Sequence, residues 1–579
     1  MRWRSLARGA AWCVAGVVGL ELLYVVGANA VLHTSLISNA VNAVEGMHFE
    51  YSGAYSLYPG RVHVTGYQHR VETYDVEFEL TIEHATMNVR LLELASRKFH
   101  VDRLQADGVA FRMRHKVHSV GRNGERLKAY PPIEGFKDPP LYQGDRTPAT
   151  PDADYHSWQV GIRNVSARVR ELWILEYRYR GEGVATGSFV LQPERFLILE
   201  PATLKLGPGK VTAGPVLAAR KASGELKCAV PYLDFRKTKG LEVLHGIVAK
   251  ADVTWEDGDL GFLNLYTQPS LGVTLSGSSH LKVSWTADKA VVPPRSQVVL
   301  DSPDATGRSD RFTVKGPLHA TLERPSDAEQ LVALVELNGA KVSHASSKRP
   351  SPRLERFNAR AVLGGVDLAK PIELAEASLR AKANIPSLSW FAAIADPSAA
   401  RHIEGQGDVS LEFERDERGT GKGEAVLVLD DVVLRSGEDE AKTAGLLSTR
   451  FKTQEQPRPF LQGGLSVKLA QVNAPDLLPG IAKLAADALT ARELNANVAY
   501  HAASTGLTLE MTQASWGALR GRGFFFAGTG RDSAGALLVS AGPARVGVRM
   551  RDGQLESSPL VGSDWLDRVW DAQRGMVKD

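Results

Sequence analysis

The stretch Val76-Glu77-Phe78-Glu79-Leu80-Thr81-Ile82-Glu83 alternates strictly between apolar and polar residues. Successive side chains of a β-strand point to opposite faces of its sheet, so this pattern gives a strand one apolar and one solvated face. Alternation of the same kind recurs from about residue 60 to about residue 550. Antiparallel sheets with one wet side show this pattern. The sequence therefore predicts a mainly β protein built from a long antiparallel sheet.

Four other runs repeat the alternation most clearly, around Phe111, Val283, Leu411 and Val548. We expect the apolar side chains of all five runs to lie on the apolar side of the predicted sheet. These residues are Val76, Phe78, Leu80, Ile82, Val109, Phe111, Met113, Leu281, Val283, Trp285, Val409, Leu411, Phe413, Val546, Val548 and Met550.

Turn signals separate the predicted strands. The segment 115–157 is rich in proline and poor in β-branched residues, which predicts a long surface loop or a boundary. The polar segment 344–352 is a second, shorter stretch of this kind. Dipeptides that favour hairpin turns stand at Asp107-Gly108, Asn123-Gly124, Asp257-Gly258 and Asp552-Gly553.

Short helices are expected to interrupt the strands at regular places. Asp259 and Ser387 each stand where they would cap the first turn of such a helix. A glycine follows each of them 18 residues later, at Gly277 and Gly405. The expected helices cover 260–266, 388–395 and 477–489, and the third copy lacks a matching glycine. This spacing predicts a degenerate repeat that arose by duplication.

An apolar run of 23 residues covers 10–32. A helix of about 20 apolar residues crosses the hydrocarbon core of a bilayer. Three arginines precede the run, and the next basic residue after it is Arg61, so the positive-inside rule keeps the N-terminus in the cytoplasm. Glu21 is a costly residue within such a span. The tripeptide Ala28-Asn29-Ala30 also resembles a signal-peptidase site, which leaves a cleaved signal as the alternative to a retained anchor.

At the other end of the chain, Asp564 to Arg574 reads as a short amphipathic helix. Leu566, Val569 and Trp570 fall on one face of it. Capping of a sheet end is the expected role, and contact with a partner or a membrane is the alternative.

Composition excludes several classes of function. The net charge of the 579 residues is +3, and no basic stripe with interleaved aromatic residues occurs, which argues against a nucleic-acid partner. Cys13 lies in the apolar run, so Cys228 is the only other cysteine and no exported disulfide pair exists. No nucleophile, phosphate-loop or zinc-protease motif is present in the sequence. We therefore expect neither an enzyme nor a cofactor.

The densest group of metal-ligating residue types is near the Pro-rich segment. His115 and His118, with Asp152, Asp154 and His156, are the members of this group. No cysteine pair or ligand spacing typical of a metal site accompanies them. We expect them to be solvated residues, and no metal site is predicted.

The first exported stretch resembles the AsmA family of bacterial envelope proteins. Tyr67 to Leu92 reads as a strand pair of the kind these proteins have. The segment from Val101 to Arg112, VDRLQADGVAFR, matches the strand–turn–strand unit of the family, x-Val-x-x-Leu-x-x-Asp-Gly-Val-x-Phe. The later strand runs broken by Asn-x-Pro helices are similar to its middle and C-terminal parts.

The resemblance implies a single-pass inner-membrane protein with its bulk in the periplasm. It further implies an elongated, bent antiparallel sheet, a groove whose apolar face binds or conducts phospholipid between the inner and outer membranes and so supports outer-membrane integrity. The sixteen apolar residues named above would face that groove, and outer-membrane components are further candidate partners. The expected organisation is a cytoplasmic N-terminus (1–9), an anchor or signal sequence (10–32), a first β-module (33–114), a Pro-rich loop (115–157), β-groove repeats (158–343), a polar linker (344–352), β-groove repeats with short helices (353–560) and a C-terminal amphipathic helix (561–579).

A second function class stays open at this point. A non-catalytic scaffold or assembly factor for outer-membrane proteins would use the same strands, with the apolar face closed by a second sheet. Periodicity does not distinguish an open groove from a barrel or a sandwich, because all three have apolar residues at every second position.

Overall fold

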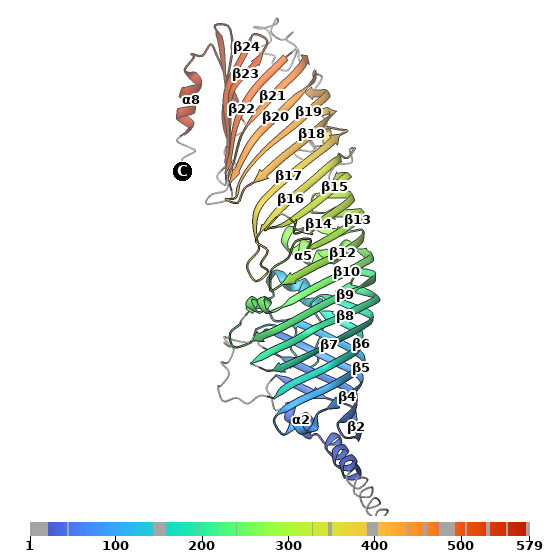
Figure 1. The fold of residues 1–579 in the computed structure, drawn as a ribbon. Coiled ribbons are helices and arrows are strands. Elements are labelled where there is room, and N and C mark those ends of the chain that lie inside the picture. Colours follow the sequence, from blue (N-terminus) through green and yellow to red (C-terminus); the bar gives the residue numbers. More distant parts are fainter. Residues whose placement is uncertain are drawn as a thin grey trace, which may run out of the picture. The chain divides into compact units, whose positions relative to one another are not determined.

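The chain folds into a mainly β protein, as the alternation predicts (Figure 1). None of the described helices is long and apolar enough to cross a membrane. The expected span 10–32 starts outside the described residues, of which 21–33 form a helix. The computed structural model describes residues 21–42, 46–73, 75–142, 158–193, 195–238, 240–326, 328–345, 350–390, 403–436, 439–454, 460–473, 493–503, 506–528, 533–551 and 554–574.

Most strands are longer than ten residues. The strands are β1 (Met47–Glu50), β2 (Gly53–Tyr58), β3 (Arg61–Glu72), β4 (Val76–Val89), β5 (Lys98–His115), β6 (Gln159–Ile174), β7 (Tyr177–Gln192), β8 (Phe196–Ala213), β9 (Val216–Asp234), β10 (Val248–Asp259), β11 (Thr274–Ser276), β12 (Ser278–Asp288), β13 (Gln297–Arg308), β14 (Phe312–Glu323), β15 (Leu331–His344), β16 (Arg353–Gly364), β17 (Glu373–Ile385), β18 (Ile403–Arg415), β19 (Thr420–Ser436), β20 (Asp439–Gln454), β21 (Phe460–Asn473), β22 (Glu493–Ala503), β23 (Gly506–Trp516), β24 (Leu519–Gly528), β25 (Ser533–Ala541), β26 (Ala544–Arg551) and β27 (Gln554–Pro559). The helices are α2 (Leu36–Asn42), α3 (Leu91–Leu94), η1 (Gly121–Asn123), α4 (Gly124–Lys128), η2 (Gly240–Gly246), η3 (Leu260–Leu263), α5 (Asn264–Leu271) and α8 (Trp565–Arg574).

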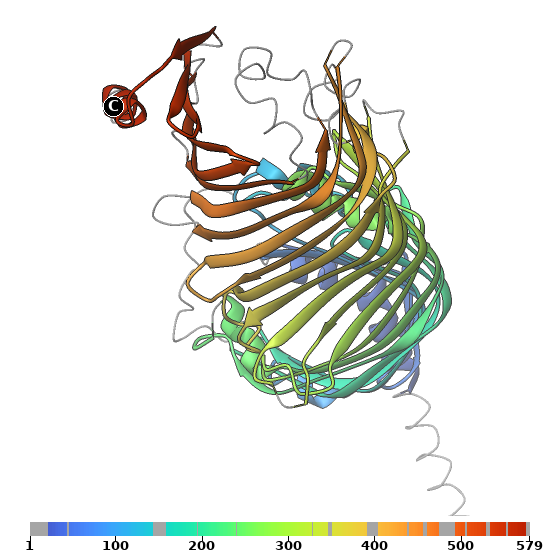
Figure 2. The same cartoon turned by 90° about the horizontal axis from the view of Figure 1, so that it is seen from above.

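The chain divides into two compact units. Unit 1 comprises Met1–Ala305, Thr321–Leu331 and Gly365–Ile372, and unit 2 comprises Thr306–Ala320, Val332–Gly364 and Glu373–Asp579. This division coincides with neither segment that the sequence offers as a boundary or linker. Each unit contains a bent, open sheet (Figure 2).

In unit 1, each strand from β3 to β9 pairs with the next along the chain, and β10 pairs with β12. One pair departs from the expected antiparallel pattern, because β5 and β6 run parallel. A parallel pair needs a long crossover connection. The Pro-rich segment 115–157 provides it, so the sheet continues past this segment. Its part up to residue 142 contains η1 and α4.

Three predicted hairpin turns are not turns. Asp107-Gly108 lies inside β5 and Asp257-Gly258 inside β10, while Asn123-Gly124 joins η1 to α4. Gly108 has φ 69° and Asp257 has φ 54°, the left-handed conformation that a β-bulge shares with a hairpin turn. The same residue types favour both structures, which explains the wrong prediction. The fourth turn, Asp552-Gly553, lies outside the described residues.

The bulge at Gly108 changes the phase of side chains along β5. Ala106 and Val109 are three positions apart, so regular alternation would send them to opposite faces. Both belong to one buried cluster with Ala85 and Val169 instead. The extra residue of a bulge shifts the alternation by one position, so the side chains after it return to the apolar side of the sheet. β5 is therefore apolar on one side along both of its limbs.

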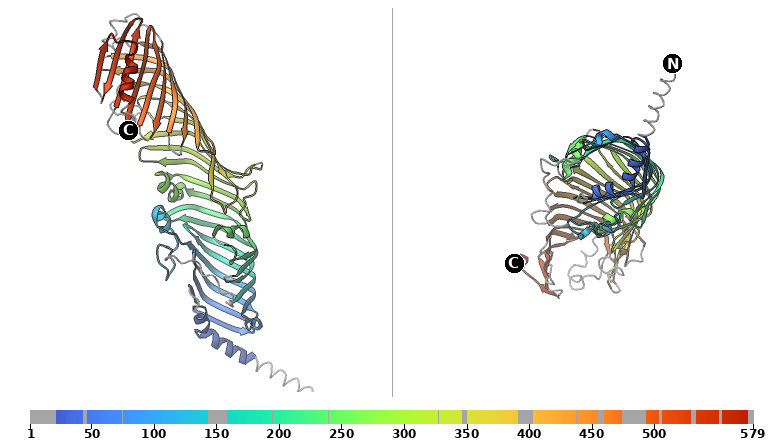
Figure 3. Two further views of the ribbon diagram at one scale, coloured as in Figure 1. Left: turned by 90° about the vertical axis from the view of Figure 1, so that its left-hand side faces the viewer. Right: turned by 90° about the horizontal axis from the view of Figure 1, so that it is seen from below.

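Unit 2 is a meander in which each strand from β16 to β27 pairs antiparallel with the next. Helix α8 lies against β24 and β25 (Figure 3). The side chains of Leu566, Val569 and Trp570 pack there on Phe524 and Leu538, so the amphipathic helix uses the face that the sequence assigns to it.

The helical insertions follow the predicted repeat. The Leu260 N–H donates to the carbonyl oxygen of Gly277 at 2.8 Å, and the Leu388 N–H donates to that of Gly405 at the same distance. The two glycines have φ 126° and 127°. Asp259 caps the first insertion by accepting from the Gly261 N–H. The second helix is described only as far as residue 390, and the third copy, 477–489, lies outside the described residues.

Candidate functional site

Pairing of the strands in unit 2 aligns their apolar side chains in continuous rows from β17 to β26. We define the unit 2 apolar face as three such rows. They are Leu379, Phe413, Gly423, Phe451, Gly463, Tyr500, Leu509, Phe525, Gly535 and Met550; then Ala381, Leu411, Ala425, Thr449, Leu465, Val498, Met511, Gly523, Leu537 and Val548; and Ala383, Val409, Leu427, Leu447, Val467, Ala496, Ala514, Gly521, Val539 and Val546.

No member of the unit 2 apolar face carries a charge. Its polar side-chain groups are the hydroxyls of Thr449 and Tyr500, whose oxygens lie 2.7 Å apart and bond to each other. The nine strand spacings of about 4.8 Å between β17 and β26 make each row roughly 43 Å long. The face is thus an uninterrupted hydrocarbon surface.

Across β17 to β20 the opposite face is charged. Arg380, Glu412, Glu424 and Arg450 stand in one row across β17 to β20. Arg380 and Glu412 form an ion pair at 3.9 Å, and Arg450 and Glu424 form one at 3.3 Å, all with exposed side chains. The two sides of the sheet at β17 to β20 therefore differ sharply in their affinity for water.

The unit 2 apolar face is half-buried rather than buried. Leu411, Phe413, Val548 and Met550 all have intermediate exposure. The inner face of a β-sandwich is filled by side chains of a second sheet. The described strands of unit 2 all belong to one sheet, and β17 to β26 contact only their neighbours along the chain and α8. The face is left accessible to a flexible apolar molecule.

Aromatic rings on this face lie flat over glycines of the adjacent strand. A Cβ at Gly463 would come 2.7 Å from the ring of Tyr500, and one at Gly421 would come 2.6 Å from the ring of Phe413. Contacts this close require hydrogen in place of a side chain. The glycines leave room for the rings to lie close to the backbone of the adjacent strand.

Unit 1 has an apolar face of the same kind. We define it by two rows that run from β4 or β5 to β12 or β13, and neither contains a charged residue. The rows are Ala85, Ala106, Ala167, Ala185, Leu204, Leu226, Ala251 and Trp285; and Val109, Val169, Gly183, Leu206, Gly224, Val253, Val283 and Val298.

The predicted site residues of β4 and β5 meet on this side of unit 1. Leu80 is the cross-strand partner of Phe111, and Phe78 is the partner of Met113. The rings of Phe78 and Phe111 have centroids 6.0 Å apart. Ile82 and Val109 are buried, whereas Val76, Phe78, Leu80, Phe111 and Met113 are half-buried.

The remaining predicted residues are also placed by register. Leu281, Val283 and Trp285 of β12 pair with Trp255, Val253 and Ala251 of β10. Val409, Leu411 and Phe413 share the unit 2 apolar face with Val546, Val548 and Met550. The sequence reasoning missed the members of both faces on β7 to β9 and β19 to β25. Glycines and bulges interrupt their alternation, although the valine and leucine content of 425–434 is a signal for a strand.

The expected wet face of β4 is covered. Glu77 and Glu79 are only 3% and 4% exposed. Arg114, itself 1% exposed, donates from Nε to Glu77, and its other nitrogens donate to the carbonyl oxygens of Pro131 at 3.1 Å and Lys137 at 3.0 Å. The described part of the Pro-rich segment is thus held against the charged side of the sheet by hydrogen bonds from Arg114 to its backbone carbonyls.

Burial affects the titration of two groups on the apolar side of β3. His69 lies edge-on to Phe49, with ring centroids 6.1 Å apart. Loss of hydration lowers the pKa of His69 and raises the pKa of Tyr67 to about 12. The Tyr67 hydroxyl and His69 Nδ1 are 3.2 Å apart. Both side chains therefore stay neutral at physiological pH.

The helical insertions cover part of each apolar face. Phe262 of η3 packs with Tyr179, Val211 and Ala222 in unit 1. Leu388 packs with Ile385, Leu429 and Val432 in unit 2, and Val409 and Leu447 border this cluster. The insertions limit the width of the open surface at one end of the strands.

Groups with catalytic or metal-binding chemistry are scarce. Among the described residues, no set of three His, Cys, Asp or Glu side chains could hold a metal ion. His115 pairs with the Tyr130 hydroxyl at 2.9 Å, and His118 stacks on Tyr142. Asp152, Asp154 and His156 lie outside the described residues. Cys228 is a half-buried free thiol whose pKa is raised by burial.

A scan against protein-family models finds no match, and a search of curated proteins finds none either. The two apolar faces are therefore the observations on which a function can be based.

Proposed function

We propose that the chain is a membrane-anchored, AsmA-like envelope protein that binds phospholipid acyl chains along its apolar faces and conducts them between the inner and outer membranes. The N-terminal run 10–32 would anchor it in the inner membrane, with the bulk in the periplasm. The proposed action requires no catalytic residue, cofactor or metal.

The observation that carries this proposal is the unit 2 apolar face. Its rows are continuous, uncharged and half-exposed, which is an unusual combination for a surface in water. Contiguous exposed apolar surface marks a site for an apolar partner. A hydrocarbon chain placed on it would gain about 0.8 kcal/mol for each methylene removed from water.

Acyl chains fit such a surface better than a compact ligand does. Adjacent rows are about 7 Å apart, because side chains on one face are two residues apart along a strand. A flexible chain can follow a row from strand to strand, so its binding requires no enclosed cavity. The charged phosphate of the lipid would remain in water outside the rows, since burying it unpaired is costly.

Site-specific photocrosslinking tests the proposal. Benzoylphenylalanine would replace Leu411 on the unit 2 apolar face, in the full chain expressed in a bacterial envelope. Ser410 is the matched control, because it is exposed and its side chain points to the opposite face. We expect lipid adducts by mass spectrometry at position 411 and none at position 410.

The same experiment tests the scaffold alternative. Protein adducts at position 411 in place of lipid adducts would favour a partner that closes the apolar face. Purification without detergent, followed by lipid extraction and mass spectrometry, gives a second readout. A lipid-free protein together with absent lipid adducts would contradict transport.

A further inference from the structure

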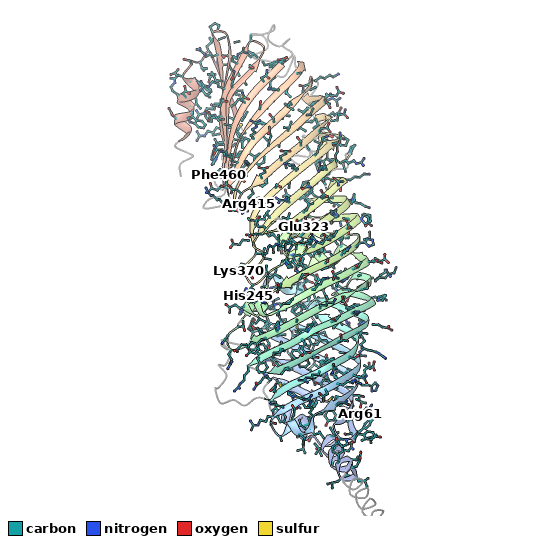
Figure 4. All side chains as sticks on the ribbon, viewed as in Figure 1. Arg61, His245, Glu323, Lys370, Arg415 and Phe460 are labelled. Carbon is teal, nitrogen blue, oxygen red and sulfur yellow. The ribbon has the colours of Figure 1, made fainter. Side chains whose placement is uncertain are left out.

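An exposed apolar patch lies at the first end of unit 1. Leu57 and Tyr58 at the end of β2 are 53% and 60% exposed, and Leu91 and Leu92 of α3 are 38% and 92% exposed. We call these four residues the apolar collar. They belong to neighbouring turns, because a Cβ at Gly60, between β2 and β3, would lie 3.9 Å from Leu91 Cγ. Exposed Arg61 is next to this turn (Figure 4).

The helix formed by residues 21–33 is fixed against the same end of the sheet. Asn29 donates from Nδ2 to the Ser56 carbonyl oxygen at 2.8 Å and accepts from the Ser56 N–H at 2.9 Å. The Tyr24 hydroxyl accepts from the Gly60 N–H at 3.0 Å. The Tyr51 hydroxyl donates to the Leu32 carbonyl oxygen at 2.6 Å. These bonds set the level of the helix relative to the β2–β3 turn.

The position of the turn along the helix determines how deep the collar would lie in a bilayer. A hydrocarbon core of about 30 Å takes about 20 helical residues, so a span that begins at Ala10 would reach the outer edge of the core at Asn29. Tyr24 would then lie five residues, or about 8 Å, inward of that edge, with the turn at Gly60 beside it. A bilayer interface is several ångströms deep and accommodates leucine and tyrosine side chains. The exposed surface of the collar matches this position.

Moving the helix outward would not keep the collar in water. If the span ended at Tyr24, only 15 residues would remain between Ala10 and the bilayer surface, or about 22 Å of helix against a core of about 30 Å. Arg8 and Arg4 would then enter the hydrocarbon, at a cost of about 2.5–3.5 kcal/mol each. Partial immersion of the collar is the less costly arrangement.

We propose that the apolar collar is a second membrane-contact site, which inserts into the outer interface of the bilayer beside the anchor. The proposal rests on the membrane anchoring in the proposed function. Leu22, Leu23 and Val26 of the adjoining helix are exposed apolar residues as well. Exposed Arg61, which follows Gly60 in the chain, suits an anionic lipid surface.

The collar also lies close to the start of the unit 1 apolar face. Val62 follows Arg61 and pairs with Met87, and both pack against the buried cluster that contains Ala85 and Ala106. Leu32 packs on that cluster too. A collar in the interface would place the first apolar residues of the sheet beside the lipid tails, without an intervening charged surface.

Depth-dependent fluorescence quenching tests the collar in the full chain. An environment-sensitive nitrobenzoxadiazole label would be attached to single cysteines, and the protein reconstituted in phosphatidylethanolamine and phosphatidylglycerol vesicles that contain a nitroxide lipid. One protein keeps Cys13 and carries Cys228→Ala. The others carry Leu92→Cys or Leu271→Cys with both native cysteines replaced. Leu271 is a matched control, because it is a leucine at a helix end in unit 1 and is 71% exposed.

We expect strong quenching at positions 13 and 92 and background quenching at position 271. Quenching at 13 alone would overturn the collar and leave the anchor intact. No quenching at either 13 or 92 would overturn both the collar and the anchoring on which it rests. Equal quenching at 92 and 271 would show that unit 1 lies on the membrane as a whole, which would also overturn the collar as a distinct site.

Discussion

The rings of Phe413 and Phe451 have centroids 6.2 Å apart and planes 11° from parallel, although β19 separates their strands. Gly423 stands between them in the row. A Cβ at Gly423 would come 2.8 Å from a ring carbon of Phe451. The glycine therefore allows two aromatic side chains to converge over one backbone. This arrangement makes glycines of the apolar face direct targets for mutation.

Gly463→Ala is expected to destabilise unit 2 and reduce the amount of bound lipid. Its methyl group would overlap the backbone carbonyl oxygen of Arg450 and meet the ring of Tyr500 at 2.7 Å, so both the strand backbone and the ring would have to shift. Overpacking of this kind costs about 1–3 kcal/mol. Denaturant unfolding and lipid mass spectrometry measure the two effects.

Gly464→Ala is the control for that variant. Gly464 is adjacent in sequence, but nothing lies within 4 Å of a Cβ at this position. We expect a change in unfolding free energy within about 1 kcal/mol and unchanged lipid content. Equal effects of the two substitutions would contradict the proposed role of the glycine under Tyr500.

Arg114→Met is expected to destabilise unit 1 by about 3–5 kcal/mol, because it leaves Glu77 buried without its main cation. Lys116 Nζ, 3.9 Å from Glu77, is the nearest remaining charge. Arg168→Met serves as the comparison, since Arg168 pairs with Asp107 at 3.2 Å with its side chain 80% exposed. That variant should lose less than about 1 kcal/mol. Urea unfolding distinguishes them, and similar losses would argue against a buried network.

The chain is expected to keep residues 21–33 after export. Cleavage after Ala30 would remove Tyr24 and Asn29 and leave the N–H and carbonyl of Ser56, a residue with 0% exposure, without their partners. Each hydrogen bond lost in this way contributes about 0.5–1.5 kcal/mol to stability, because water can replace the missing partner. Intact mass measurement of the protein from membranes would show this directly. A mature chain that begins at Val31 would refute the retained anchor.

Unit 1 is expected to lose stability as the pH falls below about 6.5, where an unfolded histidine takes up a proton. The pKa of His69 is lowered in the folded state, so the unfolded chain binds more protons in this range and stability decreases with decreasing pH. Unfolding free energies at pH 7.5 and pH 5 measure the effect.

His69→Phe should reduce the difference between the unfolding free energies at pH 7.5 and pH 5. His115, whose pKa is also lowered by burial, accounts for part of what remains. A pH dependence unchanged by His69→Phe would show that other groups control it. The variant serves as its own control, because altered packing changes stability at both pH values alike.

The sequence predicts the strands better than it predicts the bulges that bend them and the Pro-rich segment that covers them. Period-two alternation identifies β4, β12, β18 and β26, because one apolar face is enough to specify a strand. Asp107-Gly108 predicts a hairpin turn, and the structure has a bulge there. The dipeptide reports a left-handed backbone conformation, and only pairing with neighbouring strands determines whether the chain reverses there or bends.

Burial of the charged side of β4 was likewise not predictable. Glu77 and Glu79 alternate with apolar residues as exposed side chains do. Their burial depends on Arg114 and on the carbonyl oxygens of the Pro-rich segment, which come from distant positions in the sequence. The repeat of Asp259 and Gly277 in Ser387 and Gly405 was predictable, because a fixed spacing of capping residue and glycine is local information.

The meander of unit 2 has an implication for how such chains diverge. Each of its strands bonds only to the strand before it and the strand after it, so loss or gain of a complete hairpin leaves all other pairings intact. One hairpin would lengthen or shorten the sheet by about 10 Å without changing which of its sides is apolar. The length of the sheet in unit 2 can therefore change in steps of two strands.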